Sequence, residues 1–103
     1  GRSSKIAYIP VGYSDGYPRS LSNKGSVLIN DTRCNVVGRV CMDWILADVT
    51  GIGPVKSGDE AVLLGEGGRE GVRVSANEIA ELAGTIPYEI LCKISRRIER
   101  VYV

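Results

Sequence analysis

Apolar positions along the chain come in short runs that glycine and proline interrupt. The 13 glycines are spread through all 103 residues, which is typical of turn-rich β structure. We expect a strand wherever such a run is rich in strand-forming residues. The expected strands are Lys5–Val11, Ser26–Ile29, Thr32–Val37, Val40–Val49, Glu60–Leu64, Val72–Val74 and Val101–Val103.

Turn-forming residues separate these runs. Asn30-Asp31 predicts a hairpin, because both residue types tolerate turn conformations. Glycines 65, 67 and 68 predict a second turn, between Glu60–Leu64 and Val72–Val74. Longer loops are expected at residues 12–25 and 50–58, and Asp43 interrupts the longest apolar stretch, Val40–Val49.

Two short helices are predicted near the end of the chain. Ser75 and Glu78 have the spacing of a capping box, in which each side chain binds an otherwise unpaired backbone N–H, and Gly84 is placed to stop that helix. Thr85 is expected to cap the second helix, with Pro87 in its first turn. Ile86, Ile90 and Ile94 then stack at intervals of one turn.

These elements predict one mainly β domain over residues 1–103, a small β-barrel or sandwich with one or two short helices. Apolar residues make up 44% and charged residues 24%, which is ordinary for a soluble protein. The net charge of +1 gives no electrostatic reason to expect nucleic acid or an anionic membrane as a partner. No apolar run approaches the ~20 residues of a membrane span, and no signal-peptide pattern opens the chain.

The reactive side chains exclude several kinds of site. Histidine is absent, so a histidine metal site or a Ser-His triad is impossible within the chain. Cys34, Cys41 and Cys92 are odd in number and widely spaced, so we expect no disulfide framework, no metal site and a reducing cytoplasm.

Other candidate motifs favour structural interpretations. The glycines at 65, 67 and 68 lack the Gly-Lys-Ser/Thr of a phosphate loop, which favours a hairpin turn. Asp43 and Asp48 are expected on opposite faces of one strand and so form no catalytic pair. No aromatic residues interleave with the basic cluster, which favours a solvated or subunit-facing surface over RNA binding; the cluster is Lys93, Arg96, Arg97 and Arg100.

Two segments contain more polar, charged or aromatic side chains than a turn or a strand requires. Gly12–Arg19 (G-Y-S-D-G-Y-P-R) places two tyrosines, an aspartate and an arginine in a glycine-hinged loop after a strand. This suits recognition of a polar ligand, although a tight loop with tyrosine packed on the barrel fits equally well. Val37–Asp43 (V-G-R-V-C-M-D) flanks a strand with a guanidinium and a carboxylate, and the alternative is a strand whose end reaches solvent.

These two segments together resemble the paired signature of the alanine racemase C-terminal domain. The resemblance continues through V-K-S-G-D-E-A-V-L-L-G and from A-N-E-I-A-E-L to the terminal R-V-Y-V, and it covers the chain from about Lys5. It implies a homodimer in which this β domain follows an N-terminal (β/α)8 barrel and closes the active site of the other subunit. The implied activity interconverts L- and D-alanine for cell-wall peptidoglycan with pyridoxal phosphate (PLP).

The resemblance also implies which residues belong to the site. The two proton-transfer residues of the family, a barrel lysine and an upstream tyrosine, match nothing in this sequence, so we assign no catalytic residue and expect the isolated chain to be inactive and free of PLP. By this resemblance Tyr13 and Met42 bind the substrate, and the backbone N–H of Met42 approaches the substrate carboxylate. The substrate corridor contains Arg19, Arg39 and Ile86, and Tyr88 lies near the PLP phosphate. Asp43 is expected to be a partner for a nearby basic group.

Three alternatives stay open. A serine or broad-specificity racemase has the same architecture, and its substrate choice depends heavily on the barrel. A stand-alone β-barrel binding module requires stacked aromatics and a basic stripe, which the sequence lacks. A purely structural dimerisation domain is the third.

Overall fold

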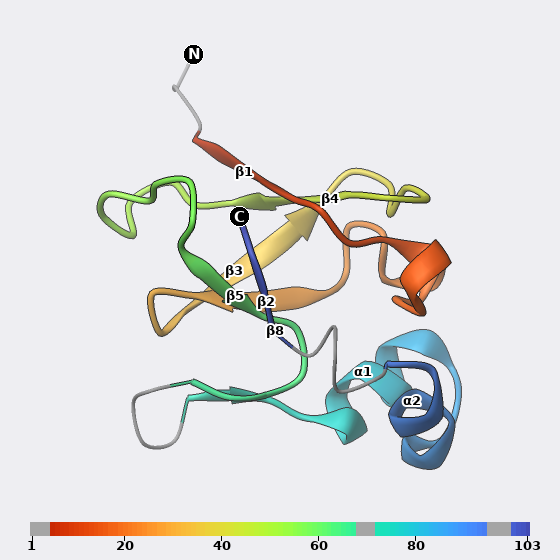
Figure 1. Cartoon of the computed structure of the whole chain (residues 1–103). Helices are drawn as coiled ribbons and strands as arrows, with labels where there is room; N and C mark the ends of the chain where they lie inside the picture. Colours follow the sequence, from red (N-terminus) through yellow and green to blue (C-terminus); the bar gives the residue numbers. More distant parts are fainter. Residues whose placement is uncertain (1–4, 68–71, 95–99) are drawn as a thin grey trace.

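Six antiparallel strands form the main body of the protein, a nearly closed barrel (Figure 1). The structure is a computed structural model that describes residues 5–67, 72–94 and 100–103. The strands lie in the order β1-β4-β3-β2-β5-β8, and every neighbouring pair is antiparallel. They are β1 (Ile6–Ile9), β2 (Ser26–Ile29), β3 (Thr32–Val37), β4 (Ile45–Asp48), β5 (Glu60–Val62) and β8 (Arg100–Tyr102).

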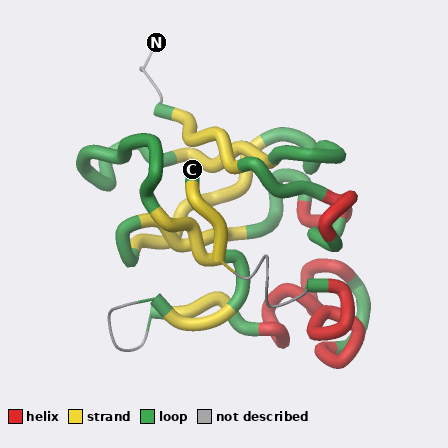
Figure 2. Tube along the Cα trace, viewed as in Figure 1, coloured by secondary structure: helices red, strands yellow, loops and turns green. Residues whose placement is uncertain are grey.

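A smaller layer of a short hairpin and two helices covers one side of the barrel. The hairpin pairs β6 (Gly65–Glu66) with β7 (Arg73–Val74), and the helices are α1 (Ala76–Ala83) and α2 (Pro87–Lys93). Two one-turn 3-10 helices, η1 (Tyr13–Asp15) and η2 (Arg19–Leu21), follow β1. In Figure 2 all the helical segments gather on one side of the molecule, and η2 contacts α1.

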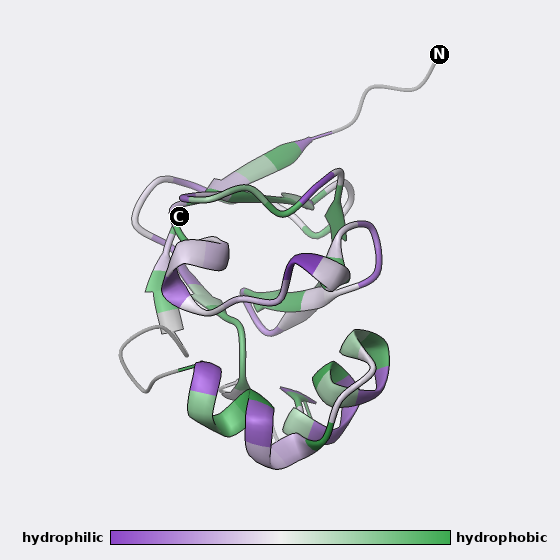
Figure 3. Cartoon of the chain, turned by 90° about the vertical axis from the view of Figure 1, so that its right-hand side faces the viewer, coloured by the Kyte–Doolittle hydropathy of each residue, from purple (hydrophilic) through white to green (hydrophobic). Residues whose placement is uncertain are grey.

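Burial along the strands follows from these two layers. Alternate residues of β1, β3 and β4 point into the barrel, whereas β2 has three consecutive buried residues. β2 is buried on both faces because β7 packs against it from outside. Figure 3 shows the barrel above the two helices, each of which mixes hydrophobic and hydrophilic residues; the buried residues of the helical layer are Val74, Ile79, Ala80, Ile90 and Ile94.

The hairpin and the first helix form as predicted. Asn30 and Asp31 both have positive φ, 51° and 59°, and lie between the paired residues Ile29 and Thr32. Ser75 caps α1 by accepting the N–H of Glu78 at 3.1 Å, and Gly84 ends α1 at φ 73°. The capping box is only half formed, because the Glu78 carboxylate binds Arg33 instead of returning to the backbone.

The predicted strand Val40–Val49 is wrong over its first half. Only Ile45–Asp48 is strand, and Cys41 donates its N–H to the Trp44 carbonyl at 3.1 Å, which places Met42 and Asp43 at the tip of a bend. Asp43 is therefore not on one strand with Asp48, and the face argument drawn from their spacing does not apply.

The pairing expected for Glu60–Leu64 is also wrong. β5 ends at Val62 and pairs with β2 and β8, while β7 pairs with β6, whose Gly65 lies inside the predicted turn. Leu63 and Leu64 are buried, so the chain leaves the barrel after β5 to join the helical layer. The rest of the predicted turn, from residue 68, lies outside the described residues, as do Arg96 and Arg97 of the basic cluster.

Helix α2 begins one residue later than predicted. Its N-cap is Ile86, and the Thr85 hydroxyl donates to the Glu89 carboxylate instead of accepting a backbone N–H. Ile90 and Ile94 are buried as expected, but Ile86 is 62% exposed, so the predicted stack of three isoleucines has only two buried members. In the part of the chain that the structure describes, no helix has the length and apolar character needed to cross a membrane.

Candidate functional site

The two segments singled out from the sequence lie against each other. Tyr13 donates its backbone N–H to the Cys41 carbonyl, and Ser14 donates its N–H to the Met42 carbonyl, each at 3.0 Å. Gly12 permits this approach, because a Cβ at that position would lie 2.1 Å from the Cys41 carbonyl oxygen. One surface is therefore built from both segments.

Ser14 strengthens the junction through its side chain. Its hydroxyl lies 2.8 Å from the Met42 carbonyl and 3.2 Å from Asp43 Oδ1, so its single proton is available to both acceptors. Within the described residues the side-chain contact of the Asp43 carboxylate is this hydroxyl, and the basic partner expected for Asp43 stays a prediction.

Tyr13 and Arg19 form the aromatic and cationic part of the site. The Arg19 guanidinium carbon lies 4.9 Å from the centre of the Tyr13 ring, within the range of a cation–π contact. Both residues line a cavity of about 580 Å³ whose wall is residues 13–19 together with Lys93. Arg19 and Lys93 give the cavity two cations against one carboxylate, that of Asp15, which accepts the Gly12 N–H at 3.1 Å.

Met42 offers an unused donor beside this cavity. Its carbonyl is occupied by Ser14, whereas its backbone N–H makes no hydrogen bond within the described residues. Met42 is 53% exposed. An unpaired N–H on a bend held by hydrogen bonds is a preorganised donor for an anionic group.

Arg39 lies on the approach to this bend. Its side chain is exposed, and the preceding Gly38 turns the chain with a left-handed φ of 74°. Arg39 makes no ion pair within the described residues, so its charge faces solvent.

Ile86 and Tyr88 are not in the cavity with Tyr13 and Arg19. They lie at the start of α2 and are 62% and 73% exposed. The other end of α2 meets the site: a Cβ at Gly16 would lie 2.1 Å from the Lys93 carbonyl oxygen. Lys93 therefore belongs to the site through a contact that is distant in sequence, which its position in a basic cluster did not predict. Its amine also lies 3.0 Å from the Glu89 carboxylate.

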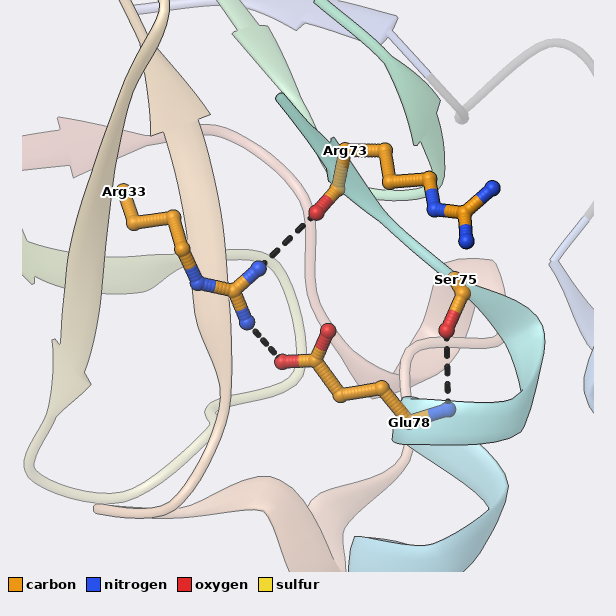
Figure 4. Close-up of polar contacts among 4 residues, drawn as sticks. All are labelled: Arg33, Arg73, Ser75 and Glu78. Atoms are coloured by element: carbon orange, nitrogen blue, oxygen red, sulfur yellow. Dashed lines mark hydrogen bonds and ion pairs between the residues drawn. The ribbon is translucent and has the colours of Figure 1, made fainter. Parts of the chain in front are cut away.

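Arg33 joins the helical layer to the barrel (Figure 4). From β3 it donates to the Arg73 carbonyl at 2.9 Å and to the Glu78 carboxylate. Nearby, burial and then the charge of Glu78 raise the pKa of Tyr17, so this fully buried phenol stays neutral. These contacts set how the layer that carries α2 sits on the barrel.

A larger groove, of about 630 Å³, lies elsewhere, beside β1 and the loop of residues 53–57. None of the residues predicted for the site lines it. Tyr8, which lines this groove, stacks on the ring of Trp44, the residue before β4, with ring centres 6.2 Å apart. No group of three or more metal-ligating side chains occurs among the described residues.

Comparisons with known proteins give one consistent result. A family model described as "Alanine racemase, C-terminal domain" matches residues 1–102. The chain is 59% identical, over 95% of its length, to the alanine racemase of Geobacter sulfurreducens, and 54% identical, over 98%, to that of Clostridium perfringens strain SM101. It covers 25% and 26% of those proteins, so it spans about a quarter of their length.

Solved structures agree with the sequence relatives. The alanine racemase of Bartonella henselae with covalently bound pyridoxal phosphate matches with a TM-score of 0.81 at 36% identity, over 93% of this chain and 25% of that one. The alanine racemase of Bacillus anthracis with bound L-Ala-P matches with a TM-score of 0.78 at 40% identity, over 89% of this chain and 22% of that one.

Proposed function

The chain belongs to the family of alanine racemase C-terminal domains, and from that premise we propose that it forms the substrate entrance of a PLP-dependent alanine racemase. In this role it acts with an N-terminal barrel domain and a second subunit of a homodimer in the cytoplasm. The relatives are alanine racemases, which supports alanine over serine as the substrate.

The observation that carries the proposal is the unpaired N–H of Met42 on a bend that is hydrogen-bonded to the segment of Tyr13. Alanine presents a carboxylate, and a backbone donor fixed on a rigid bend binds a carboxylate oxygen in one orientation. The hydrogen bonds from Tyr13 and Ser14 to the Cys41 and Met42 carbonyls hold that bend in place. Met42 and Tyr13 are the proposed substrate-binding residues.

Arg19 and Arg39 are the proposed corridor residues. Both are exposed, and their positive charge attracts an anionic substrate before it reaches the Met42 N–H. The contact of Arg19 with Tyr13 keeps one guanidinium at the aromatic wall. Ile86, exposed at the start of α2 and outside the cavity of Tyr13 and Arg19, is the proposed apolar lining of the corridor where the two subunits meet.

The residues of this chain fit a supporting role in a PLP-binding site. Tyr88 is 73% exposed and directly follows Pro87, the first residue of α2, and a phenol O–H donates well to a phosphate oxygen. When bound, PLP supplies the electron sink that makes the α-proton of alanine removable. We assign the covalent attachment and both proton transfers to residues outside this chain.

The proposal is tested by Arg39→Ala in the full-length racemase. A solvent-screened charge contributes ~1 kcal/mol at close range, so kcat/KM for alanine is expected to fall about fivefold, mainly through KM. The dependence of kcat/KM on ionic strength is expected to weaken as well.

Arg73→Ala is the matched control, because Arg73 is an exposed arginine whose carbonyl, not its guanidinium, makes the contact to Arg33. Tyr13→Phe, which keeps the ring and removes the hydroxyl, is expected to change kcat or KM without unfolding the protein. Kinetics equal to those of the control in both variants would remove these residues from the site.

A further inference from the structure

Arg19 and Arg39 come from segments that are far apart in the sequence, and neither is held by an ion pair within the described chain. Two exposed guanidinium groups repel each other, and the 19–25 loop and the 38–40 segment both lack regular strand pairing. Something else must set the separation of the two arginines if they act on the same substrate.

A single hydroxyl connects the two backbones. Ser22 Oγ donates to the Arg19 carbonyl at 2.7 Å and accepts the N–H of Val40, the residue after Arg39, at 2.8 Å. A serine hydroxyl has one proton and two lone pairs, so both bonds are made at the same time. Ser22 therefore ties the two arginine segments together directly.

Asn23 holds the other side of Arg39. Its Oδ1 accepts the Gly38 N–H at 2.6 Å, and its own N–H donates to the Gly38 carbonyl at 3.0 Å. Asn23 reaches this position in a left-handed conformation, φ 58°, which asparagine tolerates better than most residues. The backbone of Arg39 thus lies between two anchored neighbours, Gly38 and Val40.

We propose that Ser22 and Asn23 are positioning residues that set the separation of Arg19 and Arg39, so that the two guanidinium groups act as one gate for the substrate carboxylate. The proposal rests on the corridor role of the two arginines given above. Neither residue contacts the substrate in this scheme. Their effect passes through the backbone to the arginines, so they act on substrate capture and not on the chemical step.

The test uses the full-length racemase with Ser22→Ala, which removes the bridging hydroxyl, and Asn23→Gly, which removes the acceptor and keeps the left-handed backbone accessible. The expected result for each is a rise of about 2- to 5-fold in KM for L-alanine, with kcat nearly unchanged and a weaker dependence of kcat/KM on ionic strength. Ser22→Thr and Asn23→Asp restore the hydroxyl and the acceptor and are expected to recover wild-type KM.

Ser20→Ala is the matched control, since Ser20 is an exposed serine on the same 3-10 helix and makes no hydrogen bond within the described residues. If Ser22→Ala and Asn23→Gly match Ser20→Ala in KM and salt dependence while Arg19→Ala and Arg39→Ala are impaired, the positioning role is overturned and the corridor stands. If the arginine variants are also unimpaired, both ideas fall. Should Ser22→Ala fail to fold, Asn23→Gly with its Asn23→Asp rescue decides the question.

Discussion

Gly12 offers a direct test of how the two site segments are joined. Its φ of −153° and ψ of −158° are extended values that any residue adopts, so Gly12→Ala introduces no backbone strain. The cost comes only from contact, because the new Cβ would lie 2.1 Å from the Cys41 carbonyl oxygen and 2.5 Å from that of Met42. The residue 12–14 backbone must therefore move away from residues 41–42.

The magnitude follows from what that movement breaks. The hydrogen bonds from Tyr13 to Cys41 and from Ser14 to Met42 contribute ~1 kcal/mol each. Forcing a methyl group into a packed contact costs a further ~1–3 kcal/mol, and the loss of unfolded-state freedom on replacing glycine returns about 0.5 kcal/mol. We expect Gly12→Ala to lower the free energy of unfolding by about 3 kcal/mol.

Urea unfolding of the chain measures this change through the fluorescence of Trp44, the single tryptophan. Gly51→Ala is the matched control, because Gly51 has φ 81° and open space around its Cβ position, so its cost is backbone strain alone, about 1 kcal/mol. A loss for Gly12→Ala no larger than for Gly51→Ala would refute the close approach of the two segments.

Two further predictions concern the junction of barrel and helical layer. Arg33→Ala is expected to lower the free energy of unfolding by about 1 kcal/mol, because the ion pair with Glu78 is partly exposed and only the hydrogen bond to the Arg73 carbonyl adds to it. A double-mutant cycle with Glu78→Ala measures the coupling energy of the pair, and additive losses would contradict the contact. The pKa of Tyr17 is raised by burial, so its contribution to stability is complete below the unfolded pKa of ~10. It is lost as the pH rises from there towards the folded value, by up to ~1.4 kcal/mol per pH unit. Tyr17→Phe is expected to flatten this alkaline loss in urea titrations at pH 9–11, whereas Tyr102→Phe, at an exposed tyrosine, leaves it unchanged.

Features with local causes were predictable from the sequence. The hairpin of β2 and β3 depends on two adjacent residues that accept positive φ, and α1 depends on a serine cap and a glycine stop. The pairing of β5 with β8 was not predictable, because it joins residues about forty positions apart through contacts that leave no periodic signal. The exposure of Ile86 has the same origin: the helix period places three isoleucines on one side, but the layer beneath α2 extends only under Ile90 and Ile94.

The candidate site was likewise predictable only in part from the sequence. Each of its two segments was visible as a concentration of unusual residues, but their contact was not, because it depends on Gly12 lying against backbone carbonyls. Ser14, Ser22 and Lys93 were missed for a related reason. Their hydrogen bonds and cavity contacts are to distant segments, and a serine or lysine in a loop has no sequence feature that distinguishes such a role.

The wrong strand prediction at Val40–Val49 bears on function. In a strand with neighbours on both sides, as β4 has β3 and β1, the backbone N–H groups are used in pairing. Had the strand run unbroken from Val40, the N–H of Met42 would have been consumed by the sheet. The bend at Met42 and Asp43, closed by Cys41 and Trp44, removes Met42 from the ladder while hydrogen bonds from the 12–14 segment keep it rigid. The same run of apolar strand formers thus contains a buried strand and, before it, an unpaired backbone donor, and hydrophobicity alone cannot distinguish the two. The departure from the local pattern falls where the proposed binding group lies, as expected when a site requires a backbone group that regular structure would occupy.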